Sequence, residues 1–416
     1  MSRIRVLALA LVLRVLWIVA VPVEPTSDSI GYNVYARNLA KGFGYCFEPG
    51  VPAVKYPVGP SFAYSAAYRV LGQHFFAATL VNLTVALLGI WFAMLLAEIW
   101  FGRRTALLAG LLLAVWPEQI EFVTVISSEL LFNCFLLMWM VAWSSRARWL
   151  DRAWARGMLM GVAGAATCYM RPIALLLPPV LLTIDLLRPP RLERPVWTAV
   201  VSCAVMLALI APWTLRNWRD FHAFVPISAN GGLNLYEGNH PGAIGDADFP
   251  PDAAEQMTEV AADRYVGDLG WAYIRAHPAV FVGRLLPKLY RLYARENFGA
   301  YWNRPAILER YGQFGERAVR LVSDAFWFAA FAMSLSGLNL LRRRSSLKNV
   351  LTHPCFAICA YISSIYMATH AVDRFHFACV PFLAMLAALT LGTLLARRWP
   401  AFVGDDVTLE AVRVKQ

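Results

Sequence analysis

The sequence predicts an all-α polytopic membrane protein with about ten transmembrane helices and amphipathic juxtamembrane helices in its outer loops. The prediction rests on an apolar composition, on long apolar runs, and on basic residues confined to alternate connections. Of the 416 residues, 59% are hydrophobic and 16% are charged, whereas a soluble domain is about 45–50% apolar and about 25% charged. The mean hydropathy is +0.50. So much apolar surface requires a nonaqueous solvent, and the lipid bilayer is the simplest one.

The apolar runs define the predicted spans, since a helix needs roughly 20 apolar residues to cross a bilayer. They lie near 6–23, 74–98, 104–117, 122–143, 157–170, 173–187, 196–213, 321–341, 353–370 and 377–395. The third, fifth and sixth runs are short. The sequence therefore leaves the number of spans open by one pair.

Basic residues occur in every second connection between the predicted spans. They are Arg3, Arg5, Arg103, Arg104, Arg146, Arg148, Arg152, Arg156, Arg188, Arg191, Arg194, Arg342, Arg343, Arg344, Lys348, Arg397 and Arg398. These connections all fall on one side, which the positive-inside rule makes cytoplasmic, with both termini inside. The net charge of +11 is thus explained by orientation, and no nucleic-acid partner is expected.

This topology divides the chain into four parts. Residues 1–213 form an N-terminal membrane module whose first outer loop spans 24–73, and 214–320 form a large outer loop. Residues 321–398 hold the C-terminal transmembrane helices, and 399–416 form a short cytoplasmic tail. Both outer loops are too long to be turns. We expect them to carry the function, because loops commonly hold sites on a rigid scaffold.

The first outer loop begins with a predicted surface helix. Asp28 directly follows the first span and is a residue type favoured at helix N-termini. Tyr32, Tyr35 and Leu39 then recur at helical spacing, and Gly42 ends the pattern. We therefore expect Asp28 at the start of a short helix along the membrane surface.

Further amphipathic helices are predicted in both outer loops. Pro60 suits the first turn of a helix that follows Lys55, and another helix runs from the capping pattern at 252–255 to His277. Residues 279–295 then place leucines on one face and basic side chains on another, with a kink at Pro287. The basic face of this helix is Arg284, Lys288, Arg291 and Arg295.

Several motifs resemble those of one family. A membrane-edge aspartate, Asp28, is followed by Y-x-x-x-A-x-x-L-x-x-G-x-G-Y from Tyr32 to Tyr45 and by a Y-P-x-G motif at Tyr56. Other matching stretches are Ser127-Ser128-Glu129, Tyr169-Met170-Arg171-Pro172, the run 211–217, the run 230–239, and Asp373-Arg374-Phe375. Together they resemble the polyprenyl-phosphate-sugar-dependent glycosyltransferases of the GT-C fold, which include protein O-mannosyltransferases and lipid A aminoarabinose transferases.

The resemblance implies a GT-C-like helix bundle and transfer of a sugar from a polyprenyl or dolichyl phosphate to an acceptor hydroxyl on the non-cytoplasmic face. It implies a lipid, glycan or protein acceptor, contact with membrane lipids, and most simply a place in the bacterial inner membrane. The sequence departs from the family pattern at two points, one of which concerns the acidic residues. Asp28 is flanked by serines where the family often has an acidic pair, and Tyr56-Pro57-Val58-Gly59 lacks a second proline.

Asp28 is the expected catalytic base. A carboxylate at the membrane edge is partly desolvated, which would raise its pKa towards a useful range, and the resemblance places the family's catalytic aspartate here. The alternative, a helix N-cap without catalytic role, stays open.

The leaving phosphate requires cationic partners. The candidates at the outer boundary are Lys55, Arg171, Arg295 and Arg374. For Arg374 the alternatives are a salt bridge with Asp373 or contact with lipid headgroups.

Glu129 lies in an apolar run, where a carboxylate is costly and a functional candidate by default. It is expected to bind substrate, to pair with Arg14 or Arg171, or to help Asp28 hold a divalent cation. Arg14 itself is expected to be structural. No cofactor is required, and the use of a divalent metal is left open; His370 and His376 are not expected to form a metal pair.

Two other functions compete with glycosyl transfer. A transporter or lipid flippase would show repeat symmetry and polar groups at mid-bilayer, but the polar residues here cluster at the outer edge. An enzyme of the O-antigen ligase or polymerase kind would share the lipid-linked donor but would usually take a diphosphate.

Overall fold

The computed structural model describes residues 2–145, 152–188, 194–244 and 251–398, and within these ranges the regular elements are all helices. Arg146, Arg148, Arg191 and the predicted tail 399–416 lie outside the described residues, as does the side chain of Arg344. The all-α prediction is confirmed.

Each predicted span falls on a helix. These helices are α1 (Arg3–Ala20), α4 (Phe75–Phe101), α5 (Arg103–Val115), α7 (Glu129–Ser144), α8 (Ala153–Met170), α9 (Leu177–Leu187), α10 (Pro195–Phe221), α16 (Arg304–Arg344), α18 (Pro354–Ala368) and α19 (Val380–Arg398). In the described part of the chain, four helices are long and apolar enough to cross a membrane by themselves, or five if one bent pair is a single span. The number ten therefore stays a prediction.

The bent pair breaks at Pro117, where α5 gives way to α6 (Pro117–Glu121) and the short turn η1 (Phe122–Thr124) at an angle of 62°. Arg14 of α1 stabilises this break. Its buried guanidinium donates hydrogen bonds to the carbonyl oxygens of Leu113 and Ala114, at 3.2 and 3.1 Å, which are among the last carbonyls of α5. Arg14 thus has the structural role expected of it and satisfies helix-end acceptors.

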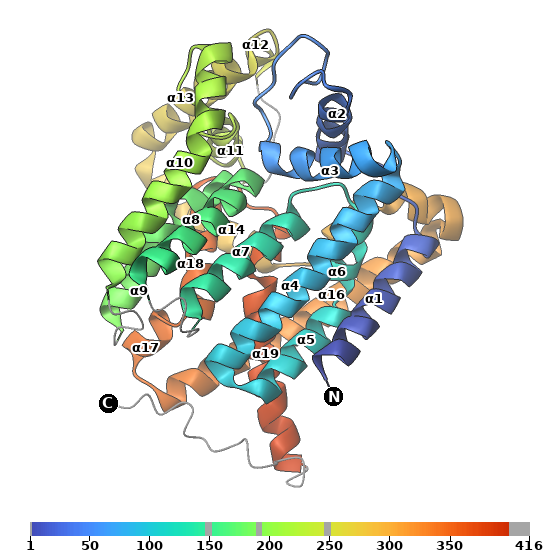
Figure 1. Ribbon diagram of the computed structural model, residues 1–416, viewed down its shortest axis with the longest axis vertical. Helices are drawn as coiled ribbons and strands as arrows, with labels where there is room; N and C mark the ends of the chain where they lie inside the picture. Colours follow the sequence, from blue (N-terminus) through green and yellow to red (C-terminus); the bar gives the residue numbers. More distant parts are fainter. Residues whose placement is uncertain (1, 146–151, 189–193, 245–250, 399–416) are drawn as a thin grey trace.

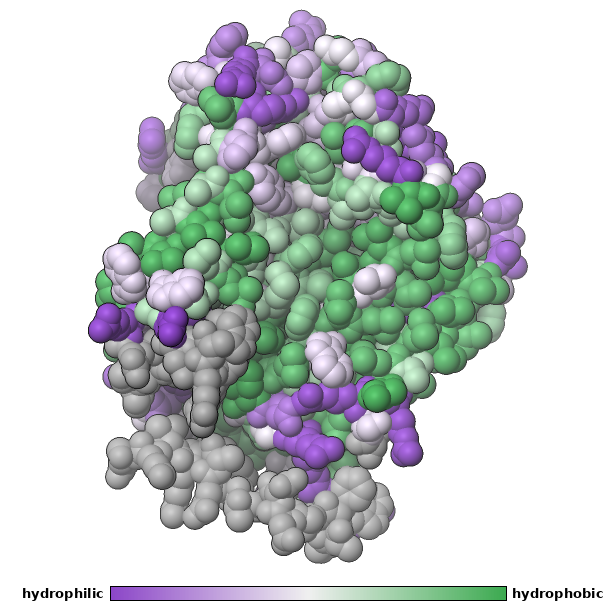
Figure 2. Space-filling view, in the orientation of Figure 1, coloured by the Kyte–Doolittle hydropathy of each residue, from purple (hydrophilic) through white to green (hydrophobic). Residues whose placement is uncertain are grey.

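The helices form one bundle with α19 near its centre and α10 at its edge (Figure 1). In their most apolar windows, 67% of the α19 segment but 22% of α10 is buried inside the protein. A broad hydrophobic belt covers the middle of the visible face, and hydrophilic residues gather above and below it (Figure 2). This distribution is that of a bundle whose outer surface faces lipid.

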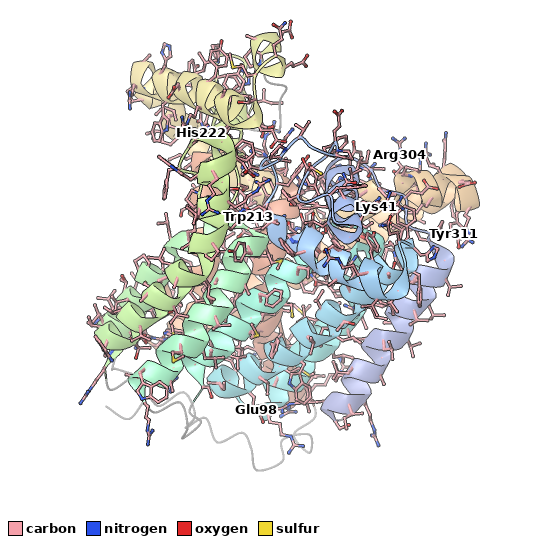
Figure 3. The ribbon with its side chains drawn as sticks, turned by 45° about the horizontal axis from the view of Figure 1, so that its top comes forward. Lys41, Glu98, Trp213, His222, Arg304 and Tyr311 are labelled. Atoms are coloured by element: carbon pink, nitrogen blue, oxygen red, sulfur yellow. The ribbon has the colours of Figure 1, made fainter. Side chains whose placement is uncertain are left out.

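The short helices of the outer loops lie together at one end of the bundle, whereas the first turn of α1 and the last turn of α19 lie at the other (Figure 1). They are α2 (Asp28–Lys41), α3 (Val58–Leu71), α11 (Gly231–Gly238), α12 (Asp252–Glu255) and α13 (Glu259–Ala276). Figure 3 shows Lys41, His222, Arg304 and Tyr311 at this end and Glu98 at the opposite one.

The predicted amphipathic helix is α14 (Pro278–Tyr293), but its faces differ from the prediction. Lys288 is fully buried, and its ammonium group donates to the side-chain oxygen of Asn239 at 3.1 Å and to the carbonyl of Thr369 at 2.5 Å. Leu286 and Tyr290 are exposed. Lys288 faces the protein interior because oxygen acceptors lie there to receive its hydrogen bonds. The exposed apolar side chains of α14 are suited to contact the membrane interface.

The remaining elements connect these helices. They are η3 (Pro172–Leu176), α15 (Phe298–Trp302), α17 (Leu347–Leu351) and η4 (Asp373–Cys379). Two of them, α15 and η4, build the candidate site.

Candidate active site

Asp28 is the first residue of α2, and its two carboxylate oxygens have different partners. Oδ1 accepts a hydrogen bond from the Tyr56 hydroxyl at 3.1 Å, and Oδ2 accepts one from Nη1 of Arg374 at 2.8 Å. The preceding Ser27 has a φ of 50°, which is rare for a residue with a side chain. Ser27 is the N-cap of α2 and makes no side-chain capping bond. Among the described residues the carboxylate of Asp28 therefore serves Tyr56 and Arg374, and the N-cap alternative finds no supporting bond.

Arg374 belongs to the turn η4, and its guanidinium lies against three aromatic rings. Its central carbon is 4.9 Å from the ring centre of Trp302, 5.2 Å from that of Phe298 and 5.1 Å from that of Phe375. Rings at these distances attract a cation and fix its position. The Nε atom is buried without a partner among the residues that the structure describes, so this group has donor capacity to spare.

A second ion pair joins Arg171 at the end of α8 to Glu129 at the start of α7. Arg171 also donates to the Ser128 hydroxyl at 2.9 Å and to the Tyr366 hydroxyl at 3.2 Å. The side chain of Glu129 is 2% exposed, so this carboxylate depends on its partner. Of the alternatives for Glu129, the structure forms the pair with Arg171.

The two ion pairs share one aromatic ring. Phe375 lies 5.7 Å from the guanidinium of Arg171 and 5.1 Å from that of Arg374. The ring of Phe375 also stacks on that of Tyr366 at 4.2 Å and meets that of His370 edge-on at 5.1 Å. The structure therefore brings Asp28, Glu129, Arg171 and Arg374 into one constellation, although they come from segments far apart in sequence.

The electrostatic environment of Asp28 differs from the expectation. Burial alone would raise the pKa of this carboxyl, but the charge of Arg374, the hydrogen bonds from Arg374 and Tyr56, and the charge of Arg171 together outweigh burial, so the pKa is lowered. The predicted rise is wrong because neither partner of the carboxylate was known from the sequence. Asp28 is thus ionised at neutral pH, as a base must be.

The other two predicted phosphate ligands lie outside this constellation. The side chain of Lys55 is exposed, with its ammonium group 5.8 Å from the ring centre of Tyr56. Arg295 is also exposed. Lys55 therefore contacts Tyr56, which in turn bonds the Asp28 carboxylate. Among the described residues, no contact joins Arg295 to Asp28.

Sequence reasoning missed three hydroxyl groups and one buried cluster. Tyr56 and Ser128 lay inside quoted motifs but were given no role, and Tyr366 carried no signal in its apolar run. His376 lies with Glu118 and Glu296 in a fully buried group, whereas His370 pairs with Glu237 at 3.0 Å.

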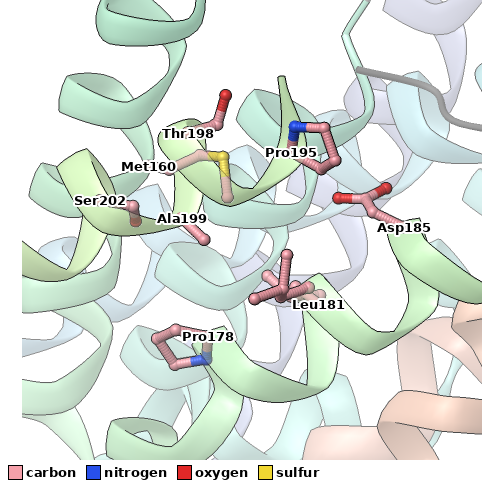
Figure 4. Close-up of a pocket in the computed structure, with 9 residues that line it drawn as sticks. Met160, Pro178, Leu181, Asp185, Pro195, Thr198, Ala199 and Ser202 are labelled. Atoms are coloured by element: carbon pink, nitrogen blue, oxygen red, sulfur yellow. The ribbon is translucent and has the colours of Figure 1, made fainter. Parts of the chain in front are cut away.

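One described cavity lies away from the constellation. It encloses about 260 Å³ between α8, α9 and α10, with Met160, Leu181 and Ser202 in its lining (Figure 4). None of the constellation's residues lines it, so it offers no argument about the site.

The sequence matches one protein family over part of its length, and the structure is similar to solved structures. Residues 55–215 match the family described as dolichyl-phosphate-mannose-protein mannosyltransferase. The oligosaccharyltransferase of Archaeoglobus fulgidus in its apo form superposes with a TM-score of 0.57 at 13% identity, over 96% of this chain and 52% of the other. The chain has the GT-C fold. It spans about half the length of that oligosaccharyltransferase.

Two further comparisons involve GT-C proteins. The same oligosaccharyltransferase tethered to an acceptor peptide gives a TM-score of 0.58 at 11% identity, over 98% of this chain and 51% of the other. ArnT from Cupriavidus metallidurans, bound to undecaprenyl phosphate, gives 0.46 at 14% identity, over 97% and 80%. No curated protein matches in sequence. The resemblance seen in the motifs is confirmed by the family profile and the GT-C fold.

Proposed function

We propose that this protein is a membrane glycosyltransferase that moves a sugar from a polyprenyl or dolichyl phosphate to an acceptor hydroxyl. The observation that carries the proposal is the constellation of Asp28 with Arg374 and of Glu129 with Arg171. A base beside two aromatic-bound guanidinium groups is suited to activating a hydroxyl next to a phosphate leaving group. The matched mannosyltransferase profile supports the donor class, as does an archaeal oligosaccharyltransferase structure that contains a dolichol-phosphate and an inhibitory peptide.

Asp28 acts as the general base in this proposal. Its carboxylate takes the proton of the acceptor hydroxyl while the acceptor oxygen bonds to the anomeric carbon of the sugar. The bond from that carbon to the phosphate oxygen breaks, and the lipid leaves as a polyprenyl phosphate. Donor binding would also strengthen the base, because a bound phosphate offsets the charge of Arg374, the main influence that lowers the pKa of Asp28.

Arg374 and Arg171 are the proposed phosphate ligands. The unused Nε donor of Arg374 and the aromatic rings around it favour an incoming anion without loss of position. Glu129 orients Arg171 and balances its charge while the site is empty of donor. Lys55, being exposed beside Tyr56, would guide the anionic headgroup towards the site, and exposed Arg295 would contact lipid headgroups.

The proposed orientation puts this constellation outside the cell. The ends of the helices that carry Arg3, Arg103 and Arg397 lie opposite α2 and α11 (Figure 1). By the positive-inside rule the former end is cytoplasmic, with both termini inside, and the site faces the periplasm or lumen. A bacterial inner membrane is the simplest setting, and the acceptor is a lipid, glycan or protein that reaches this face.

The arginine-lined site does not have the composition of a metal site. One structure of the archaeal oligosaccharyltransferase is a complex with Zn and sulfate. In this chain, however, Asp28 and Glu129 are each paired with an arginine, and among the described residues they do not belong to a group of three metal-ligating side chains. We therefore derive no step of the reaction through a metal at Asp28.

The test is the release of free polyprenyl phosphate from liposomes that contain mixed polyprenyl-phosphate sugars and an acceptor extract. We expect Asp28→Asn to lower this release by roughly 10²–10⁴-fold, the usual contribution of a general base. Asp220→Asn is the matched control, because Asp220 also pairs with an arginine at 2.8 Å and is 32% exposed, but lies on α10 away from the constellation.

The outcomes separate the hypotheses. Loss of release in a folded Asp28→Asn protein with a normal Asp220→Asn control supports the proposal. Equal release from both variants would keep the enzyme class and remove Asp28 from the chemistry. No release by the wild type, in an extract shown competent with a control transferase, would favour a transporter.

A further inference from the structure

A cluster of ionisable side chains lies buried beside the constellation. Glu118 of α6, Glu296 before α15 and His376 of η4 are 1%, 0% and 0% exposed. Their carboxylate oxygens and imidazole nitrogen all lie within 4.8 Å of one another. Neither carboxylate takes part in glycosyl transfer as proposed above, so the cluster needs its own explanation.

The hydrogen bonds of the His376 imidazole determine which of its ring nitrogens carries a proton. Its Nδ1 is 2.6 Å from the carbonyl oxygen of Leu292, which can only accept, so Nδ1 carries the hydrogen. In a neutral imidazole, Nε2 then presents a lone pair. That lone pair faces Oε1 of Glu296 at 3.3 Å. Two lone pairs cannot be stable in this arrangement unless a positive charge or a proton lies between them.

The outer oxygens of both carboxylates are already engaged. Oε1 of Glu118 accepts from the backbone N–H of Gly299 at 3.1 Å, and Oε2 of Glu296 accepts from the indole N–H of Trp116 at 2.6 Å. Such bonds orient the carboxylates and leave their remaining oxygens for the centre of the cluster. Metal-ligating side chains are typically held by partners of this kind.

The negative charge of the cluster has no balancing cation in the described part of the chain. No lysine or arginine forms a salt bridge with Glu118 or Glu296 there, and Glu296 pairs only with His376. A third buried carboxylate, Glu121, lies on the other side of Gly299 with its Oε2 unpartnered among the described residues. Buried carboxylates without a cationic partner cost several kcal/mol each, so the cluster must hold either protons or a metal cation.

We propose that Glu118, Glu296 and His376 bind a divalent transition-metal ion of the Zn²⁺ class. Two carboxylate oxygens and one imidazole nitrogen are ligands that Zn²⁺ and Mn²⁺ accept. With bonds of about 2.0–2.2 Å, side-chain movements of about 1 Å would close the three atoms on an ion. The site contains neither Asp28 nor Glu129, and the proposal does not depend on the proposed reaction.

An ion at this point would hold together the three segments that position Arg374. His376 is two residues from Arg374 in the same turn, and Glu296 is two residues from Phe298, whose ring contacts the Arg374 guanidinium. Glu118 anchors both to the break between α5 and α6. The ion is thus a positioning element for the guanidinium and not a participant in bond making.

The test is the metal content of the full-length protein purified in detergent without chelators. We expect about one equivalent of tightly bound metal in the wild type, and at least tenfold weaker Zn²⁺ retention in His376→Gln and Glu296→Gln. His370→Gln is the matched control, because His370 is also buried and bonded to a glutamate at 3.0 Å but lies outside the cluster. Co²⁺ taken up by the stripped wild type should show d–d absorption bands that His376→Gln lacks.

Every outcome decides the question. Metal lost from both cluster variants and kept by His370→Gln supports the site, and melting temperatures that fall on chelation and recover with Zn²⁺ confirm binding in a folded protein. A wild type that holds no metal and takes up neither Zn²⁺ nor Co²⁺ would overturn it and leave shared protons as the explanation. Equal retention in all variants would also overturn it, by placing the metal elsewhere.

Discussion

Asp28 is held by one neutral and one charged donor, and this asymmetry governs its chemistry. Tyr56 bonds one oxygen and Arg374 the other. The charged partner keeps the carboxylate ionised, whereas burial opposes ionisation. The resting state is therefore a weak base that donor binding can strengthen.

This balance predicts a pH effect of Arg374→Gln. In the wild type the lowered pKa puts the acid limb of Asp28 below its ordinary pKa of about 3.9. Without the guanidinium, burial dominates and raises the pKa, so the carboxylate is protonated at a higher pH. We expect the acid limb of the pH profile of kcat/KM to move to higher pH.

The position of the limb, and not the height of the profile, is the measured quantity, because losing a phosphate ligand also slows the reaction. Arg216→Gln, which breaks a partly exposed pair with Asp220, should leave the limb in place. An unchanged limb in Arg374→Gln would show that Arg374 does not control the ionisation of Asp28.

At the scale of elements, helix positions followed from the sequence but helix neighbours did not. Apolar runs and Gly42 located α2 and the predicted spans, because these signals are local. The partner of Asp28 lies 346 residues away in sequence, and no local pattern encodes that contact. Lys288 is a second contact that no local pattern encodes. The helical periodicity placed it on a basic face, but its ammonium group is buried and bonds Asn239 and Thr369.

The same reasoning explains why the buried cluster was missed. In the sequence, Glu118 lies in a short connection between two predicted spans. In the structure, the sharp bend after α5 turns its side chain into the protein. His376 was separated from Glu296 by 80 residues. Only the packing of α6, α15 and η4 brings them together.

The α8–α10 contact yields a prediction at this scale. A Cβ atom at Gly161 would lie 2.6 Å from Cβ of Val205 and 2.7 Å from the carbonyl oxygen of Ser202, so the two helices approach through glycine. We expect Gly161→Leu to separate them and to destabilise the protein by about 1–3 kcal/mol. The melting temperature of the detergent-solubilised protein should fall by several degrees.

Gly283→Leu is the control for that substitution. Gly283 also lies in a helix, α14, but a Cβ there meets nothing within 4 Å. Its melting temperature should stay the same or rise, because leucine favours helix more than glycine does. Equal losses in both variants would mean that the effect is not one of helix packing.

At the scale of the whole molecule, the membrane topology can be tested with residues that lie at opposite ends of the bundle. Lys41 and Glu98 lie at opposite ends (Figure 3), and the native cysteines are buried or half-buried. We expect a membrane-impermeant maleimide added to intact spheroplasts to label Lys41→Cys and to spare Glu98→Cys. Permeabilised cells should show labelling of both.

The reverse pattern would invert the orientation and place the constellation in the cytoplasm. Labelling of both positions in intact spheroplasts would instead indicate leakage, which a cytoplasmic marker enzyme reports independently. The outcome bears on the acceptor, because only molecules on the labelled side of Lys41 can reach Asp28.

The backbone at Ser27 has a consequence for how such a chain can change over generations. A φ of 50° is costly for serine and natural for glycine. Selection for heat resistance alone would favour glycine there, since it relieves the strain. The same replacement would loosen the backbone that aims the neighbouring carboxylate, so turnover would suffer. Thermal stability and catalytic turnover therefore favour different residues at position 27.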